Sequence, residues 1–435
     1  MRALLGKLRI HAEDLLRYHP AVRSALAASI LLKSRPAPAA NTADAARLVH
    51  RLCQAARLAP SQAAMLRTEA AIERLLPAID PAAVPWSEFL PGFDKAAAVQ
   101  KAIVLKRRVS EREKGVVFVS FDNQMARLAR AANLREFARR YTLVLAPSWS
   151  PPHSVVSYLF PRLYRAPIFC LLSNLSDLHA FPRIDGQYIP VPLYASNWVD
   201  ARLYPQAGER AKDIDILMVA NFGKFKRHFV FFSALRDLPR EYKILLVGQD
   251  EAGRTRESIL REAALYGVAG RFELRQDVPY DELQSIMTRA KVSLVLSRRE
   301  GSCVVAVESL FANTPVGLFE DAAIGSRVFI NPQTGRLLRH RNLAAQIREF
   351  VATAAQYQPR AWAIENGIDC VGSSRTLNAI LKQHALARGE EWTEEIATLC
   401  WRPDPQYYDP QDGERLRPSY AEIEAASGVR IALPR

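Results

Sequence analysis

Two glutamates, Glu300 and Glu308, are the residues of this sequence best placed to do chemistry. The apolar run 292–296 lies just before them, and its β-branched content predicts a buried strand. Residues 304–311 contain no helix breaker and predict a helix. One carboxylate is therefore expected in the loop at the carboxyl end of a strand, and the other about one turn inside the next helix. The free N–H groups of that helix's first turn favour an anion such as phosphate.

The surrounding stretch resembles the donor-site motif of the retaining enzymes called glycosyl transferases group 1. In that family two glutamates separated by seven residues hold a nucleotide sugar. The matching positions are Ser297, Arg298, Glu300, Gly301, Glu308, Thr314, Pro315 and Val316. Asn313 stands where the family usually has glycine. The resemblance spans about residues 114–355 and includes Asn197, Val199, Asp200, Tyr204 and Pro205 of an interdomain stretch.

The resemblance implies roles for the residues of the glutamate stretch. Glu308 would accept hydrogen bonds from the ribose hydroxyls, and Glu300 would hold a hydroxyl of the transferred sugar and count as catalytic. The small-residue turn and helix start beside them would complete the donor site, namely Gly301, Ser302, Cys303 and Val304. The alternative for either glutamate is a charge near a helix N-terminus that only offsets the helix dipole.

A basic loop, residues 221–228, follows the first predicted strand of the same region. Basic side chains at the carboxyl end of a parallel strand face the ligand crevice and can neutralise a diphosphate. Lys226 stands where the family has a catalytic lysine, whereas Asn221 replaces the family's arginine, a role that Lys224 or Arg227 could take over. Gly248, which ends the next strand, is a further donor-site candidate. The alternative is a solvated basic turn.

His179 follows the third strand of the preceding α/β region and is a candidate to touch the transferred sugar or the acceptor, as a histidine in a comparable loop of some relatives does. The alternative is a purely structural histidine. The sequence has no cluster with metal-ligand spacing, so we expect no metal and no cofactor besides the nucleoside-diphosphate sugar as co-substrate. It also lacks an acid pair of the kind that hydrolases use.

The predicted elements divide the chain into four parts. Residues 1–112 are expected to form a helical extension, and 391–435 a proline-rich, extended tail that packs back on the body. Strands alternate with helices in between, which predicts parallel sheets in an acceptor domain at 113–209 and a donor domain at 210–390. The expected fold class is therefore α/β, with two Rossmann-like domains of the GT-B type and an N-terminal helical extension.

Composition limits the compartment and the partners. The 435 residues carry a net charge of +14, which favours anionic partners. The five cysteines are scattered, which argues against a disulfide framework and for a reducing compartment. No apolar run reaches bilayer length. We expect a cytoplasmic protein. The basic first helix is expected to be a solvated helix packed on its neighbours, and the alternative is contact with an anionic membrane at its inner face.

The leading hypothesis is a retaining, hexosyltransferase-type glycosyltransferase of polysaccharide biosynthesis. It would move a sugar from a nucleoside-diphosphate sugar to a glycan or lipid-linked saccharide. One alternative is a nucleotide-sugar epimerase of the same fold. Another is an inactive module that binds saccharide or nucleic acid, although nucleic acid is not an expected partner.

Overall fold

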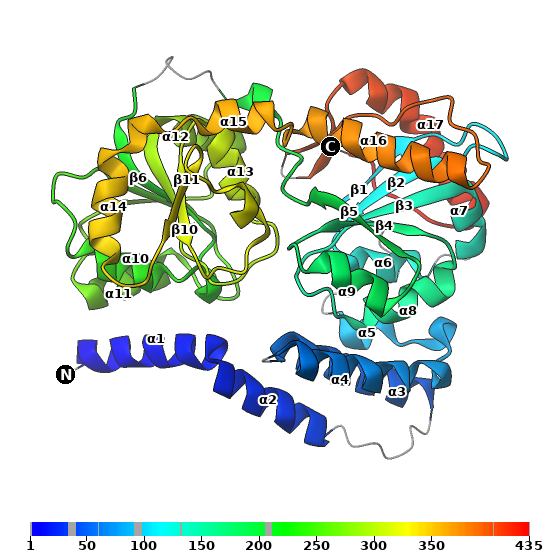
Figure 1. Cartoon of the computed structure of the whole chain (residues 1–435), viewed down its shortest axis with the longest axis horizontal. Helices are drawn as coiled ribbons and strands as arrows, with labels where there is room; N and C mark the ends of the chain where they lie inside the picture. Colours follow the sequence, from blue (N-terminus) through cyan, green and yellow to red (C-terminus); the bar gives the residue numbers. More distant parts are fainter. Residues whose placement is uncertain are drawn as a thin grey trace. The chain divides into compact units, whose positions relative to one another are not determined.

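The computed structural model describes residues 2–33, 41–59, 61–90, 98–130, 133–204, 211–402 and 404–434 (Figure 1). Contacts divide the chain into two compact units. Unit 1 comprises Met1–Leu15 and Ser196–Ser373, and unit 2 comprises Leu16–Ala195 and Ser374–Arg435. The predicted domain boundary at 209/210 and the motif residue Pro205 lie outside the described residues.

Unit 1 contains a six-stranded sheet in the order β11-β10-β9-β6-β7-β8, with every neighbouring pair parallel. In chain order this is the 3-2-1-4-5-6 arrangement of a Rossmann sheet, whose order reverses between its first and fourth strands. Its strands are β6 (Ile214–Val219), β7 (Ile244–Gly248), β8 (Glu273–Gln276), β9 (Ala290–Val295), β10 (Val316–Phe319) and β11 (Gly335–Leu338). The reversal falls between β6 and β9, and a ligand crevice is expected there.

The helices of unit 1 alternate with these strands, as the sequence predicted. Between strands lie α10 (His228–Leu235), α11 (Arg256–Tyr266), α12 (Tyr280–Arg289) and α13 (Val304–Phe311), followed by α14 (Leu343–Ala352) and α15 (Pro359–Glu365). Unit 1 also includes most of α1 (Arg2–Tyr18) and the start of α16 (Cys370–Ala387). The sheet is filled by fully buried aliphatic residues such as Ile216, Leu217 and Val292.

Unit 2 contains a five-stranded sheet in the order β1-β2-β3-β4-β5. Its strands are β1 (Ala102–Lys106), β2 (Gly115–Ser120), β3 (Tyr141–Ala146), β4 (Ile168–Leu172) and β5 (Tyr188–Tyr194). The last four are parallel, as predicted, and α6 (Asp122–Leu128), α7 (Leu134–Arg140), α8 (Val155–Tyr164) and α9 (Asp177–Ile184) connect them. Strand β1 is a correction, because residues 102–106 lie in the segment predicted to be helical and instead pair antiparallel with β2.

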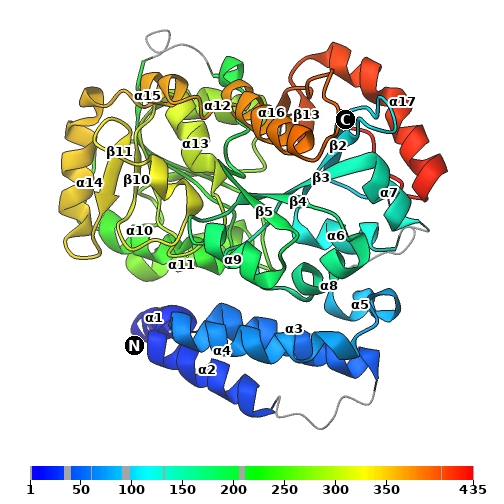
Figure 2. The ribbon, with the colours of Figure 1, turned by 45° about the vertical axis from the view of Figure 1, so that its right-hand side comes forward.

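The N-terminal helical region is present. It consists of α1, α2 (Pro20–Lys33), α3 (Thr42–Leu58), α4 (Gln62–Glu73) and α5 (Trp86–Phe89). Helices α2, α3 and α4 pack side by side in unit 2, as Figure 2 shows. The buried small face of α3, with Ala45, Ala46 and Val49 fully covered, lets its neighbours approach closely.

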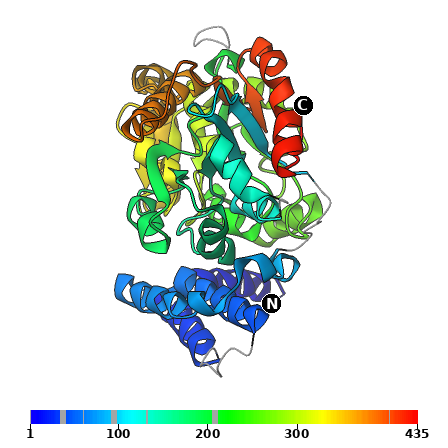
Figure 3. The same cartoon turned by 90° about the vertical axis from the view of Figure 1, so that its right-hand side faces the viewer.

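The prediction that residues 391–435 form an extended tail is only partly correct. Residues after 398 form a short hairpin, β12 (Leu399–Trp401) with β13 (Pro405–Tyr407), followed by the 18-residue helix α17 (Pro410–Ser427). Asp409 caps this helix, and Pro410 occupies its first turn, where a missing N–H is harmless. Helix α17, red in Figure 3, packs on α7 and β1 of the same unit. The tail thus packs back on unit 2, but mainly as a helix.

In the described ranges, no helix combines the length and the apolar character needed to cross a bilayer. The fold class is confirmed: both units are α/β with mainly parallel sheets, and a helical region is present near the N-terminus.

Candidate functional site

The candidate site lies where the loops after β6 and β9 meet, at the point where the strand order of unit 1 reverses. Lys226, in the first loop, places its Nζ 2.7 Å from Oε2 of Glu300, in the second. The Arg227 guanidinium reaches the carbonyl oxygen of Leu296, just past β9, at 3.5 Å. Ligands of doubly wound sheets bind at such reversals. The fold therefore brings two of the sequence candidates, Lys226 and Glu300, into contact.

The Lys226–Glu300 pair is largely withdrawn from water, with 14% and 8% of the two side chains exposed. Burial is the largest single effect and lowers the pKa of Lys226, but the charge and hydrogen bond of Glu300, together with other nearby acidic groups, outweigh it and the net pKa is raised. The lysine therefore stays cationic. Glu300 also accepts a hydrogen bond from the Ser297 hydroxyl through its other oxygen. That contact gives a structural reason for the serine three residues before the glutamate in the motif.

The loop that carries Glu300 is held by backbone hydrogen bonds to residues 323–326. The carbonyl oxygens of Gly301 and Ser302 accept from the N–H groups of Gly325 and Ser326 at 2.9 and 3.0 Å. The Glu300 N–H donates to the carbonyl of Ala323 at 3.2 Å. These bonds fix the turn before α13.

Cys303 and Val304 form the entry to α13. Cys303 takes a left-handed φ of 56°, and the helix begins at Val304. Burial, together with the nearby charge of Glu300, raises the pKa of the Cys303 thiol to about 12. A thiol with such a pKa is protonated at neutral pH and is not a nucleophile. Its position near Glu300 therefore concerns shape and hydrogen bonding rather than covalent chemistry.

Glu308 lies in the second turn of α13 and is 5% exposed. The Tyr280 hydroxyl donates a hydrogen bond of 2.8 Å to its Oε1, and Tyr204 lies beside Tyr280. Burial raises the pKa of Glu308 to about 6. This carboxylate is therefore held ready to accept further hydrogen bonds at neutral pH, at a cost in desolvation.

The far end of α13 is anchored through Thr314 and its neighbour Asn313. The Thr314 hydroxyl donates to the carbonyl of Met287 at 2.7 Å, and Lys212 Nζ donates to that hydroxyl oxygen and to the Asn313 carbonyl at 2.9 Å each. Asn313 takes a left-handed φ of 51°, which explains why the family usually has glycine there and why asparagine is acceptable. Val316 then begins β10. The helix that positions Glu308 is thus fixed at both ends.

The loop after β6 departs from the family at Asn221. Its Oδ1 accepts from the Gly223 N–H at 3.3 Å, and its Nδ2 donates to Glu251 at 3.4 Å. Asn221 therefore shapes this loop rather than presenting a positive charge. Gly248 has a packing role, because an added Cβ would lie 2.4 Å from the carbonyl oxygen of Ala220.

The other two cations of this loop, Lys224 and Arg227, make contacts with the first helix that sequence reasoning missed. Lys224 Nζ lies 2.6 Å from the carboxylate of Glu13, and Arg227 forms a two-pronged pair with Asp14 at 2.9 and 3.1 Å. Both acids are on α1. These contacts join residues more than 200 positions apart in sequence, so no local pattern could have revealed them.

His179 belongs to unit 2, where it lies on α9 and not in a free loop. Its side chain is exposed, and its carbonyl oxygen accepts a hydrogen bond of 2.6 Å from Arg183. Its contact with a sugar remains a prediction.

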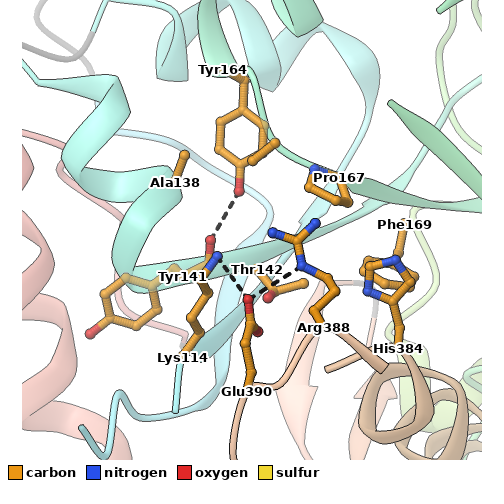
Figure 4. Close-up of a pocket in the computed structure, with 11 residues that line it drawn as sticks. Lys114, Ala138, Tyr141, Thr142, Tyr164, Pro167, Phe169, His384, Arg388 and Glu390 are labelled. Carbon is orange, nitrogen blue, oxygen red and sulfur yellow. Dashed lines mark hydrogen bonds and ion pairs between the residues drawn. The ribbon is translucent and has the colours of Figure 1, made fainter. Parts of the chain in front are cut away.

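Unit 2 has a small pocket of its own between β3, β4 and the end of α16 (Figure 4). Lys114 and Arg388 both pair with Glu390 there, at 3.3 and 3.4 Å, and the Tyr164 hydroxyl donates to the Tyr141 carbonyl at 3.0 Å. The cavity measures about 20 Å³, room for little more than one water molecule. It cannot hold a sugar.

Taken together, the two α/β units with their parallel sheets define a GT-B type fold. Residues 201–367 match the family model described as glycosyl transferases group 1, so the resemblance inferred from the motif is confirmed. That match contains Lys226, Glu300 and Glu308, and it supports sugar transfer as the class of activity.

Solved structures of similar fold include sucrose-phosphate synthase from Thermosynechococcus elongatus, with 17% identity over 62% of this chain and 74% of that one, and a TM-score of 0.49. The Anabaena protein Alr3699/HepE, solved in complex with UDP, shows 16% identity over 64% and 79%, with a TM-score of 0.47. The protein TarM shows 13% identity over 63% and 53%, with a TM-score of 0.43. A comparison with curated protein sequences gives no match.

Proposed function

We propose that this protein is a metal-independent glycosyltransferase that moves a sugar from a nucleoside-diphosphate sugar to an acceptor hydroxyl with retention of anomeric configuration. The observation that carries the proposal is the Lys226–Glu300 pair at the strand-order reversal, with Glu308 on the helix that follows. The family match over the same residues supports it.

Sugar transfer builds negative charge on the leaving diphosphate and positive charge at the anomeric carbon. Lys226 is the cation held closest to the centre of the cluster, and it would stabilise the leaving group together with the N–H groups at the start of α13. Glu300 orients Lys226 and would share its remaining hydrogen-bonding capacity with a sugar hydroxyl. The proton of the acceptor hydroxyl would pass to the departing diphosphate oxygen, so the scheme requires no general base from the protein.

Glu308 would bind the ribose. Its carboxylate already accepts one hydrogen bond from Tyr280, and a carboxylate can accept several. Because α13 is fixed by Thr314 and Lys212, the distance between Glu308 and the Glu300 loop is set before ligand binds. Such preorganisation favours catalysis by charge stabilisation.

The acceptor in this proposal is a glycan or lipid-linked saccharide near an anionic membrane. On α1 the exposed leucines gather on one side of the helix, namely Leu4, Leu5, Leu8, Leu15 and Leu16, between 55% and 63% exposed. The first 33 residues carry six basic and two acidic side chains. An apolar face flanked by basic residues is the chemistry that binds an anionic lipid surface.

Sedimentation with vesicles tests the membrane contact. Binding to vesicles of phosphatidylglycerol should fall strongly in L4S/L8S/L15S. The matched control L175S/L386S/L433S replaces three leucines of similar exposure elsewhere and should bind as the wild type does. Equal binding of the two variants would contradict the membrane proposal without touching the enzymatic one.

One observation favours a second candidate, a module that binds a saccharide but transfers nothing. Asn221 gives the loop no positive charge where the family has arginine. The decisive experiment is donor turnover with and without acceptor, after a thermal-shift panel of nucleoside diphosphates has identified the base. Acceptor-dependent release of diphosphate supports a transferase, whereas donor conversion without acceptor supports an epimerase. Ligand binding without any turnover supports the binding module.

A further inference from the structure

Helix α1 contacts unit 1 through its polar side. Besides the pairs of Glu13 and Asp14 with the basic loop, the His11 ring meets Phe229 edge-on at 5.1 Å between ring centroids, and Lys7 Nζ lies 4.9 Å from the Tyr266 ring centre. Gly6 passes so close to Leu265 that an added Cβ would come within 3.0 Å of it. Figure 1 shows α1 running along α10 and α11, the helices that carry these partners.

This orientation is the reverse of the usual one. An amphipathic helix normally buries its apolar stripe and leaves its charges in water. Successive residues of a helix are rotated by about 100° around its axis. The exposed leucines of α1 therefore point away from the side that carries Gly6, Ile10 and Asp14. That second side is partly covered. Ion pairs therefore hold α1 on unit 1 more than apolar burial does. The Lys224–Glu13 pair is exposed and contributes little, so the largely buried Arg227–Asp14 pair is the main ionic contact of the helix.

The pairs resemble the contacts that a diphosphate would make. Asp14 accepts from both Nε and Nη2 of Arg227, the fork geometry that arginine also offers to phosphate. The same guanidinium reaches the Leu296 carbonyl, four residues before Glu300. Lys224, which pairs with Glu13, lies two residues before Lys226. The carboxylates of α1 thus occupy cations at the edge of the candidate diphosphate site.

We propose that Glu13 and Asp14 are an internal stand-in for the donor diphosphate, so that α1 is a latch that the nucleotide must displace. The inference rests on the proposed function, because it requires Lys224 and Arg227 to serve a diphosphate. A diphosphate carries more charge than the two separate carboxylates can present to these cations, so it competes successfully. The latch lowers apparent donor affinity, since the competent conformation is only part of the population.

Calorimetry with UDP and inorganic pyrophosphate as probes tests the latch on the full chain. The double variant E13Q/D14N should bind both probes about three- to tenfold more tightly than the wild type, because the exposed Lys224–Glu13 pair and the largely buried Arg227–Asp14 pair no longer compete. The matched control E273Q removes an ion pair with Arg275 elsewhere on unit 1 and should leave both affinities unchanged.

Hydrogen exchange gives an independent readout. Saturating UDP should increase exchange in the amides of residues 2–18 of the wild type, and E13Q/D14N should show that faster exchange without ligand. Equal affinities together with unchanged exchange in α1 would overturn the latch. If K226A still weakens binding in that case, the proposed function stands and only the latch fails. If neither probe binds wild type or E13Q/D14N, both proposals fail.

Discussion

The ammonium group of Lys226 lies 2.7 Å from the carboxylate of Glu300, although the residues are 74 positions apart in sequence. One follows β6 and the other follows β9, and these strands are neighbours only because the sheet reverses its order between them. The pair is therefore a direct product of the topology. The ion pair also holds the loop that carries Lys226 against the loop that carries Glu300.

Breaking this pair should reduce both stability and donor binding. K226A leaves Glu300 buried without its cation, which should lower the free energy of unfolding by about 3 kcal/mol. The double variant K226A/E300A removes both charges and should recover most of that loss while staying inactive. Urea unfolding and UDP calorimetry on wild type, K226A, E300A and K226A/E300A give the coupling. Full additivity of the two single substitutions would show that the pair contributes nothing as a pair.

The buried carboxylate of Glu308 should lower the free energy of unfolding at pH 7 while it contributes to UDP binding. Burial raises its pKa to about 6, from an ordinary value of 4.5. The folded state therefore binds more protons than the unfolded state between these values, and stability falls as pH rises through this window. At pH 7 the loss from this group is about 2 kcal/mol. E308Q should thus be more stable than wild type at pH 7 and bind UDP more weakly. Calorimetric melting at pH 4.5 and pH 7 should show the stability difference only at the higher pH.

The same pKa sets a pH dependence for donor binding. A protonated Glu308 loses most of its capacity to accept hydrogen bonds from ribose hydroxyls, so UDP affinity should fall as the pH drops below about 6. Inorganic pyrophosphate has no ribose and serves as the control. The ratio of the two affinities removes the titration of the phosphates themselves. A ratio that stays constant from pH 7.5 to pH 5 would mean that Glu308 does not contact the ribose.

The strand and helix alternation of unit 1 could be predicted because each of its buried strands is a short β-branched or aliphatic run between turn residues. The relative position of the two motif glutamates could be predicted for a related reason. Glu300 and Glu308 lie on one continuous strand-loop-helix segment, so their relation is local. The contacts that anchor this segment, such as Lys212 with Thr314, join distant residues and leave no periodic signal.

Three features could not be obtained in this way. Residues 102–106 follow an alanine-rich segment that favours a helix, but pairing with β2 outweighs local propensity. The prolines near residue 410 suggested an extended chain, whereas Pro410 stands in the first turn of α17, a position where proline is favoured. The acids of α1 gave no sign of their partners, because charge complementarity across 211 and 213 positions is invisible in a single sequence.

The replacement of arginine by Asn221 offers a direct test of how much positive charge the loop needs. N221R should tighten UDP binding several-fold, because a guanidinium would be added at the carboxyl end of β6, where anions are favoured. It should also lower stability modestly, since the hydrogen bond from the Gly223 N–H is lost. The matched variant N221Q keeps the amide without the charge and should not gain affinity. If N221R raises acceptor-dependent turnover together with affinity, the loop serves the leaving group in transfer. A gain in affinity alone, with turnover absent in both proteins, would instead identify a binding module that retains the nucleotide site.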